Sequence, residues 1–567
     1  MRYLKLAELY DSLSKTTKRL EKTEILSKFL REIQDSDKEI LYLLMGDIYP
    51  EYNMKKIGIN DQLAIKAIAK STGMNKERVV SEWKSIGDLG KVAENLTKHK
   101  KQVTLQTHIL TTEKVLDNLR KLPELEGKGT VDKKIALITE LLTSASPLEA
   151  LYLTRTLIGD LRIGVQESTI REAMSSAFFD GSKESALKIQ DAINKSNDLA
   201  EVFDIAKSGK EKDLGNVKIE VGKPIKAMLA EKVKTIKKGF EAVGKPCAIE
   251  YKYDGFRLII HKKGDEVLLF TRTLENVSEQ FPEVADYIRK YVKGNSFILD
   301  SEAVGYDKKT KEYKAFQSIS QRIKRKYDIK KLSEELPVEV NIFDVLMYEG
   351  KSLLNEPFKK RTELVKKIIE NHPYKIICSK QIITDDEKKA EEFYKRALRD
   401  KQEGVMMKNL ESDYSPGRRV GNMVKIKPEE RDLDLVITGG EYGTGKRSGW
   451  ISSFILSCRD DDKFLEIGKV GTGFKEKENQ GVSFYELTEK VKPYITEEKG
   501  KNVKIKPKVV VSVTYQEIQR SPTYSSGFAL RFPRFTALRP DRSTIDITSL
   551  KEVEKDFEKQ KRNWEYG

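Results

Sequence analysis

The first 215 residues carry apolar side chains at helical spacing. In the segment TKRLEKTEILSKFLREI, residues 17–33, apolar positions recur every three or four residues and polar residues fill the other face. Ser36 with Glu39, and Ser146 with Glu149, have the spacing of a capping box at a helix start. The pattern predicts an all-α region over residues 1–215, with a polar linker at residues 207–213.

Residues 216–428 change to a strand-like pattern interrupted by helical stretches. The segment CAIEYKYDGFRLIIHKKGDEVLLFTRT, residues 247–273, is expected to form two strands that turn at residues 263–265. Residues 296–307 and 338–348 predict further strands, and residues 359–372 and 386–400 predict helices. An α+β domain with antiparallel sheets follows.

Residues 429–567 predict a third region built from short strands that glycine punctuates. The segments LDLVITGGEYGTGKRSGWISSFILSCRD, KFLEIGKVGTGF and KVVVSVTYQEI carry this pattern. It is typical of a small barrel such as an oligonucleotide-binding (OB) fold. A helix is expected to close the chain from about Ser549.

One glycine-rich stretch imitates a phosphate-binding loop. Residues 440–446, GEYGTGK, fit the G-x-x-x-x-G-K part of a P-loop. Arg447 follows where Ser or Thr would hold Mg²⁺, and the chain continues as a strand where a helix should begin. A glycine-rich hairpin that carries basic residues is the preferred interpretation.

The charge balance narrows the class of partner. The 567 residues include 105 Lys and Arg against 89 Asp and Glu, a formal net charge of +16, and the pI is about 9.2. This balance favours a polyanionic partner. Nucleic acid is preferred over a membrane, because the longest apolar runs, such as residues 40–45, are far too short to span a bilayer. The N-terminal residues show no signal peptide.

Cysteine and histidine usage limits the metal chemistry. The three cysteines are widely spaced and odd in number, so neither a disulfide framework nor a zinc cluster is expected. A reducing cellular interior is expected instead. The histidines show no metal-ligand spacing. A catalytic metal is therefore expected to be a hard ion held by carboxylates and substrate phosphates, Mg²⁺ or in its place Mn²⁺. The residues concerned are Cys247, Cys378, Cys458, His99, His108, His261 and His372.

Lys252, in the stretch EYKYDGFRLII, is the candidate nucleophile. An ammonium ion has no lone pair, so its proton must be lost before or during attack on phosphorus. Gly255 allows a close approach of backbone or substrate, whereas Arg257 would point away from Lys252 on a regular strand unless the chain bends at the glycine. The alternative is that Lys252 forms an ordinary ion pair with Glu250 or Asp254 on a solvated sheet face.

The motifs around this lysine resemble a known family. KYDGFR matches the K-x-D-G-x-R motif of the covalent nucleotidyltransferases, which include ATP-dependent DNA ligases, RNA ligases and capping enzymes. The companion motifs follow in the family's order: TRTLEN, ILDSEAVGYD, VNIFDVLMYEG, EGVMMKN with Lys408, and MVKIKPE. LRFPRFTALRPD resembles the C-terminal motif of ligases. QRIKRKYDI and LYLTRTLIGDLRIGVQESTIREAM resemble the archaeal and eukaryotic replicative DNA ligases.

The resemblance implies a role for each matching residue. Lys252 would carry AMP, Glu302 and Glu403 would hold Mg²⁺, and Phe343 would stack on adenine. The residues expected around the nucleotide are Glu250, Arg257, Arg272, Glu302, Phe343, Arg419, Lys425 and Lys427. Arg531 and Arg534 are expected to orient the leaving pyrophosphate.

The expected activity is ATP-dependent sealing of nicks in duplex DNA, in replication, repair and recombination. Arg155 and Arg162 are candidate phosphate contacts in the helical region, although a solvated helix face explains them equally well. A monomer is expected, in the cytoplasm of an archaeal-type cell or in a eukaryotic nucleus. A sliding clamp is considered as a partner, but no clamp-binding peptide is evident. The alternatives are an RNA ligase or capping-type enzyme, or a non-catalytic DNA-binding scaffold.

Overall fold

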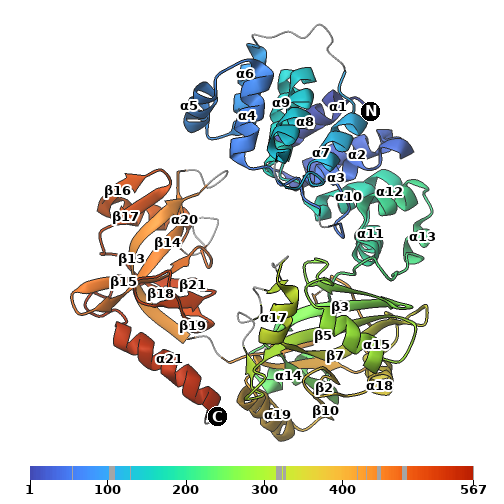
Figure 1. Cartoon of the computed structure of the whole chain (residues 1–567), viewed down its shortest axis with the longest axis vertical. Helices are drawn as coiled ribbons and strands as arrows, with labels where there is room; N and C mark the ends of the chain where they lie inside the picture. The colour runs from blue at the N-terminus through green and yellow to red at the C-terminus, as the bar shows by residue number, and fades with distance from the viewer. Residues whose placement is uncertain are drawn as a thin grey trace.

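The chain folds into three regions, which Figure 1 shows as a helical lobe, a central α/β lobe and a smaller β lobe with a C-terminal helix. This computed structural model describes residues 1–53, 55–100, 109–127, 129–314, 319, 322–323, 327–417, 419–428, 431–443, 449–474 and 482–565. The predicted fold class is confirmed: helices come first, then a central α+β region, then a curled antiparallel sheet. The domain limits at residues 215 and 428 stay predictions.

The N-terminal region contains helices and no β-strand within its described residues. One hydrophobic cluster, from Tyr3 to Val217, holds it together. The helices are α1 (Tyr3–Ser14), α2 (Arg19–Glu32), α3 (Ile40–Leu44), α4 (Asp61–Thr72), α5 (Lys76–Ile86), α6 (Leu89–Lys98), α7 (Thr112–Lys121), α8 (Thr130–Ser144), α9 (Pro147–Leu157), α10 (Glu167–Phe178), α11 (Lys183–Ser196), α12 (Leu199–Lys207) and α13 (Glu211–Gly215).

One of the two predicted capping boxes is present. Ser146 and Glu149 cap the start of α9 reciprocally, so that prediction is confirmed. The prediction for Ser36 and Glu39 is wrong. Ser36 lies in a short 3₁₀ turn, and the Glu39 carboxylate instead accepts from Arg120 on α7 at 2.9 Å.

The predicted linker at residues 207–213 is also wrong. This stretch contains the end of α12 and the start of α13. Leu214 and Val217 pack in the helical core, which explains why the polar residues before them stay folded. The segment that leads into the central region lies further on, at residues 216–228, and we call it the connecting segment.

The central region contains two sheets. The first has five strands in the order β1-β12-β11-β2-β10, and the second has seven, with β4-β3-β5-β7-β8 in line, β6 on β5 and β9 on β7. All pairs are antiparallel except β1 with β12 and β7 with β9. The elements are β1 (Leu229–Lys232), α14 (Ile236–Val243), β2 (Cys247–Lys252), β3 (Phe256–Lys263), β4 (Glu266–Thr271), α15 (Pro282–Tyr291), β5 (Ser296–Tyr306), β6 (Tyr313–Lys314), α17 (Ile329–Glu335), β7 (Val338–Tyr348), β8 (Lys351–Ser352), α18 (Phe358–Ile368), β9 (Ile376–Cys378), β10 (Gln381–Thr384), α19 (Glu387–Arg399), β11 (Gly404–Asn409) and β12 (Arg419–Ile426).

The chain crosses from one sheet to the other directly after Lys252. Two strands were predicted over residues 247–273, but three form, because β2 ends at Lys252 and β3 begins at Phe256 in the other sheet. A Cβ at Gly255 would lie 2.2 Å from the Ala303 carbonyl oxygen on β5. Only glycine fits at this position. The crossing of the chain from one sheet to the other opens the space between the two sheets. The predicted turn at residues 263–265 is confirmed between β3 and β4.

The C-terminal region combines a curled antiparallel sheet with one helix of eight residues and a final helix of 16. β13 pairs with β14, β17 and β18, and β18 also pairs with β21. The expected final helix is present, and Ser549 caps it through Glu552. The elements are β13 (Arg431–Tyr442), β14 (Ile451–Asp460), β15 (Lys463–Val470), α20 (Phe484–Val491), β16 (Ile495–Lys499), β17 (Asn502–Ile505), β18 (Val510–Tyr515), β19 (Glu517–Arg520), β20 (Phe528–Arg531), β21 (Arg534–Leu538) and α21 (Leu550–Glu565).

The rejected P-loop lies partly within this sheet. Gly440 is inside β13, opposite Phe454 of β14 and Val503 of β17. Residues 444–446 of the motif, like Arg447, lie outside the described residues. No described helix combines the length and apolar character that crossing a membrane requires.

Candidate active site

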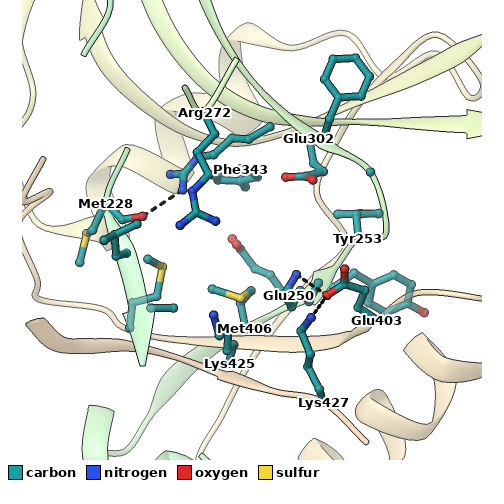
Figure 2. Close-up of a pocket in the computed structure, with 18 of the residues that line it drawn as sticks. Met228, Glu250, Tyr253, Arg272, Glu302, Phe343, Glu403, Met406, Lys425 and Lys427 are labelled. Carbon is teal, nitrogen blue, oxygen red and sulfur yellow. Dashed lines mark hydrogen bonds and ion pairs between the residues drawn. The ribbon is translucent and has the colours of Figure 1, made fainter. Parts of the chain in front are cut away.

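A cavity of about 420 Å³ lies where the two central sheets separate and the C-terminal region approaches them. Figure 2 shows its lining side chains converging from both sheets. Lys252, Glu302 and Phe343 come from β2, β5 and β7, and Arg531 comes from the end of β20. Most of the residues predicted from sequence motifs therefore meet in one place.

Lys252 points into this cavity and forms neither of the ion pairs considered as its alternative role. Its Nζ lies 2.6 Å from Glu403 Oε2. Lys427 forms an ion pair with the same carboxylate oxygen, and both contacts are drawn in Figure 2. Glu403 is brought there because β11 pairs with β2, so that Gly404 stands opposite Lys252.

The charges gathered at this point shift the pKa values of Glu403 and Lys427. Burial raises the pKa of the Glu403 carboxyl, but the ammonium groups of Lys252 and Lys427 outweigh burial and hold this pKa below its usual range. Burial, together with the nearby charge of Lys252, lowers the pKa of the Lys427 ammonium. An ionised Glu403 thus lies within hydrogen-bonding distance of the candidate nucleophile.

Glu302 faces the same cavity from β5. Burial, opposed by the charges of Lys252 and Arg257, raises the pKa of its carboxyl to about 7. Among the described residues, no hydrogen-bond donor or cation is bonded to this carboxylate. A half-buried acid without a partner among the described residues would gain from a bound cation.

The donor set fits a hard cation that completes its shell with phosphate oxygens. Glu302 and Glu403 line one cavity and supply only carboxylate oxygens, as Mg²⁺ prefers. No group of three or more His, Cys, Asp or Glu with metal-site geometry occurs within the described residues. The protein alone therefore offers part of a coordination shell, as expected for a metal that binds together with a nucleotide.

Arg257 is held rigidly rather than left free for solvent. Its Nε donates to Asp300 Oδ1 at 2.8 Å, its Nη2 bonds the other oxygen of Asp300, and its Nη1 donates to the Met228 carbonyl at 2.9 Å. The Tyr414 hydroxyl donates to Asp300 at 2.7 Å and accepts from the Met228 amide at 3.1 Å. Bending of the chain at Gly255 brings Arg257 to the cavity that Lys252 lines.

Glu250 is almost fully buried, with both carboxylate oxygens engaged. Oε2 lies 2.7 Å from Lys408 Nζ, and Oε1 accepts from Gln381 Nε2 at 2.8 Å. The Lys408 ammonium also lies 4.7 Å from the centre of the Phe343 ring and 4.5 Å from that of Phe358. These contacts place a charged acceptor and an aromatic face side by side in the cavity wall.

Arg272, Lys425 and Lys427 add positive charge to the lining (Figure 2). Arg272 is exposed, and its guanidinium points into the cavity. Lys425 lies on β12 and Lys427 directly after it, so both reach the cavity, as their two-residue spacing predicted. Arg419 begins β12, but its side chain lies outside the described part of the structure.

The two C-terminal arginines are placed differently. Arg531 lines the cavity, lies 3.9 Å from Asp254 Oδ1 and pairs with Glu517 at 3.1 Å. Burial and the charge of Glu403 raise the pKa of the Asp254 carboxyl to about 6. Arg534 is exposed on β21 and does not line the cavity, so the structure brings only Arg531 to the site.

Arg155 and Arg162 do not form an open phosphate-binding surface. Arg155 is 8% exposed and donates to Asp88 Oδ2 at 2.7 Å. Arg162 donates to the same oxygen at 3.2 Å and also pairs with Asp160. Asp88 in turn caps α6 by accepting from the amide of Gly90. Arg155 is therefore engaged in a buried ion pair, which a contact with DNA would have to break.

Several residues that line the cavity or hold its lining side chains were not predicted. Asp300, Tyr414 and Gln381 hold Arg257 and Glu250, while Gln516 and Phe532 reach the cavity from the C-terminal region. Asp300 had a signal, because it lies two residues before Glu302 on the same strand and so on the same face. Tyr414 and Gln381 are isolated polar residues and had none.

Three family models match successive parts of the chain. The model for the DNA ligase N terminus matches residues 2–175, that for the ATP dependent DNA ligase domain matches residues 227–427, and that for the ATP dependent DNA ligase C terminal region matches residues 447–542. A DNA ligase of Nanoarchaeum equitans is 45% identical over 99% of both chains. A DNA ligase of Thermococcus onnurineus is 38% identical, again over 99% of both chains.

The chain belongs to the ATP-dependent DNA ligase family, of the archaeal type. A solved structure named Pmar-Lig_PreS3 superposes with a TM-score of 0.58 at 19% identity, over 94% of this chain and 99% of that one. At this level of identity the superposition shows a shared fold and nothing further. Membership of the family confirms the resemblance that the ordered motifs indicated, and it covers the helical region as well as the two that follow.

Proposed function

We propose that this chain seals nicks in duplex DNA by way of an AMP group carried on Lys252. The single observation that carries the proposal is the position of the Lys252 ammonium. It projects from the end of β2 into a cavity that Glu302, Phe343 and six further cationic side chains also line. A binding site for a nucleoside triphosphate needs both an aromatic or apolar wall for the base and positive charge for the phosphates.

In the first step the Lys252 nitrogen attacks the α-phosphorus of ATP, the bond to the β-phosphate oxygen breaks, and pyrophosphate leaves. Glu403 Oε2 lies 2.6 Å from Lys252 Nζ and holds this nitrogen at the cavity, and the ammonium must lose its proton before or during the attack. Lys425, Lys427 and Arg272 face the phosphates, and Arg531 orients the pyrophosphate. Arg534 would reach it only after the C-terminal region moves.

In the second step an oxygen of the DNA 5′-phosphate attacks the same phosphorus, and the bond to Lys252 breaks. The 3′-hydroxyl then attacks the 5′-phosphorus, the phosphodiester forms and AMP leaves. Negative charge spreads over phosphoryl oxygens in each step, so fixed cations supply most of the stabilisation. Mg²⁺, held by Glu302 and Glu403 with phosphate oxygens, would add further positive charge there.

The base and sugar of ATP are assigned to the opposite wall. Phe343 offers a ring face to adenine, and Glu250 offers a carboxylate to its edge. Arg257, fixed by Asp300, is assigned to the ribose and phosphates together with Arg419. The helical region is expected to grip duplex DNA through its basic surface without reading sequence. Action as a monomer, Mn²⁺ as a substitute, a sliding-clamp partner and the cellular compartment stay predictions.

Intact-mass spectrometry after incubation with ATP and Mg²⁺ tests the proposal. We expect an AMP adduct on Lys252 in the wild type and none in Lys252→Arg, because a guanidinium does not lose its proton at neutral pH. Lys263→Arg is the matched control, since Lys263 is exposed at the end of β3. Addition of nicked DNA should remove the adduct and join the strands.

The same preparation separates the alternatives. An RNA ligase would discharge the adduct only on nicked RNA, and a capping-type enzyme would form a GMP adduct from GTP. A non-catalytic DNA-binding scaffold would bind DNA without any adduct, which would overturn the proposal.

A further inference from the structure

Gln381 lies outside the family's motif series, yet it is bonded to one of the residues that face the nucleotide cavity. β10 pairs with β2 so that Gln381 stands directly opposite Glu250. Its Nε2 donates to Glu250 Oε1 at 2.8 Å and to Thr362 Oγ1 at 3.0 Å. Lys366 Nζ donates to Gln381 Oε1 at 2.8 Å, and this contact fixes which end of the amide faces Glu250.

Glu250 is thus held from two sides. Gln381 bonds one carboxylate oxygen, and Lys408 bonds the other at 2.7 Å. The side chain is 3% exposed and lines the cavity. Since each carboxylate oxygen has two lone pairs and one protein donor, the acceptor capacity that remains is available to a ligand. An ionised carboxylate held in this way can accept hydrogen bonds but cannot donate one.

We propose that Gln381 is a positioning residue that sets the choice of base, by holding Glu250 as a fixed hydrogen-bond acceptor. The proposal rests on the proposed function, in which Glu250 meets the edge of the purine. Adenine presents a 6-amino donor at that edge, whereas guanine and hypoxanthine present a 6-oxo acceptor. A 6-oxo group placed against this buried carboxylate sets two acceptors against each other with no donor between them, which is costly.

The hydrogen bonds from Lys366 to Gln381 and from Gln381 to Glu250 hold the Glu250 carboxylate in one orientation. Without the Gln381 amide, Glu250 Oε1 loses its fixed donor and the carboxylate can rotate toward Lys408. A rotated carboxylate accepts less well from the 6-amino group and repels a 6-oxo group less. The ratio of the rate with ATP to the rate with a 6-oxo nucleotide should therefore change, whereas a purely structural defect would lower both rates by the same factor.

The test compares ATP with ITP, because inosine carries the 6-oxo group without the 2-amino group of guanine. The probe is the rate of nucleotide transfer to Lys252, followed by intact-mass spectrometry as kcat/KM for each triphosphate. In Gln381→Leu we expect the preference for ATP over ITP to fall about tenfold, the value of one hydrogen bond to a charged group. Thr384→Val, on the same strand, should keep the wild-type preference.

Two further variants keep the test decisive if Gln381→Leu does not fold. Gln381→Glu has the same size but replaces the amide donor by a second acceptor, so Glu250 Oε1 again loses its fixed donor. The preference of this variant for ATP over ITP should therefore fall, as in Gln381→Leu. Lys366→Met, at an exposed position on α18, should shift the preference in the same direction by a smaller factor.

The possible outcomes distinguish a failure of the role given to Gln381 from a failure of the proposed function. Wild-type preference in all three folded variants would overturn the role of Gln381 and leave the adduct on Lys252 intact. A fall in rate that is equal for ATP and ITP would also overturn it, since that result describes a purely structural residue. Absence of any adduct in the wild type would instead overturn the proposed function and this inference with it.

Discussion

His261 on β3 is a fully buried imidazole outside the candidate active site. Its Nδ1 accepts from the Gly222 amide of the connecting segment at 3.1 Å, and its ring packs edge-on against Phe270. Burial lowers the pKa of His261 to about 3. The residue therefore stays neutral in the folded protein over the whole physiological range.

This burial predicts an acid sensitivity of the central region. Between pH 6.5 and 3 the unfolded chain binds a proton at His261 that the folded chain does not, so the free energy of unfolding falls as the pH drops below about 6.5. At pH 5 the loss is roughly 2 kcal/mol. Urea unfolding of wild type and His261→Gln at pH 7.5 and 5 measures it. Equal pH shifts in both proteins would contradict the prediction.

Sequence motifs identified most residues of the site but not their contacts. Lys252 and Glu403 are far apart in the chain, and only the pairing of β2 with β11 makes them neighbours. Arg155 had a local warning: it stands in LYLTRTL, where apolar residues surround it, and such a position predicts burial rather than a solvated helix face. Its partner Asp88 lies on another helix start, which no local pattern reveals.

At the scale of elements, the crossing at Gly255 decides whether the site exists. The contact between Gly255 and Ala303 on β5 leaves no room for a side chain, because an added Cβ would lie 2.2 Å from a backbone oxygen. Backbone on a central strand cannot give way cheaply. The separation of β2 and β3 into two sheets therefore depends on one hydrogen in place of a methyl group.

Gly255→Ala should accordingly destabilise the central region and abolish AMP transfer to Lys252. We expect a cost of about 1–3 kcal/mol from overpacking. The matched control is Gly421→Ala on β12, where an added Cβ meets nothing within 4 Å. Thermal unfolding and adduct formation measure both variants, and equal behaviour of the two would refute the argument.

The strand and helix patterns were sufficient for the order of elements but not for sheet membership. Residues 247–262 look like one continuous strand because Tyr253 is as strand-compatible as its neighbours, and its burial satisfies either arrangement. Residues 207–213 look like a linker because they are polar, yet Leu214 behind them anchors the stretch to the helical core. Composition records polarity, whereas the fold depends on which apolar side chains find partners.

At the scale of the whole molecule, the connecting segment joins the helical and central regions through defined contacts. Lys226 forms ion pairs at 2.8 Å with both Glu51 and Glu167 of the helical region. Asn197 bonds the carbonyl of Pro224. A few residues further on, Met228 bonds Arg257 and Tyr414 at the nucleotide cavity.

Lys226→Met should loosen the connecting segment while leaving each region folded. Its loss leaves two carboxylates facing each other without their shared cation, which repel. We expect faster thermolysin cleavage within residues 216–228, by a factor of about ten. The control is Lys218→Met, at an exposed position in the same segment. Identical cleavage rates in the two variants would show that these ion pairs do not restrain the segment.

The packing of the connecting segment also limits where the chain can be divided. Ile219 and Ile225 belong to a hydrophobic cluster with Ile259, Ile298 and Leu346 of the central sheet. A fragment that starts at residue 227, where the match to the ligase domain begins, would lack both isoleucines and expose that apolar surface to water. Such a fragment should aggregate, whereas one that starts near residue 216 keeps the cluster whole. A gene rearrangement that moved the central region into another protein would therefore have to include the connecting segment.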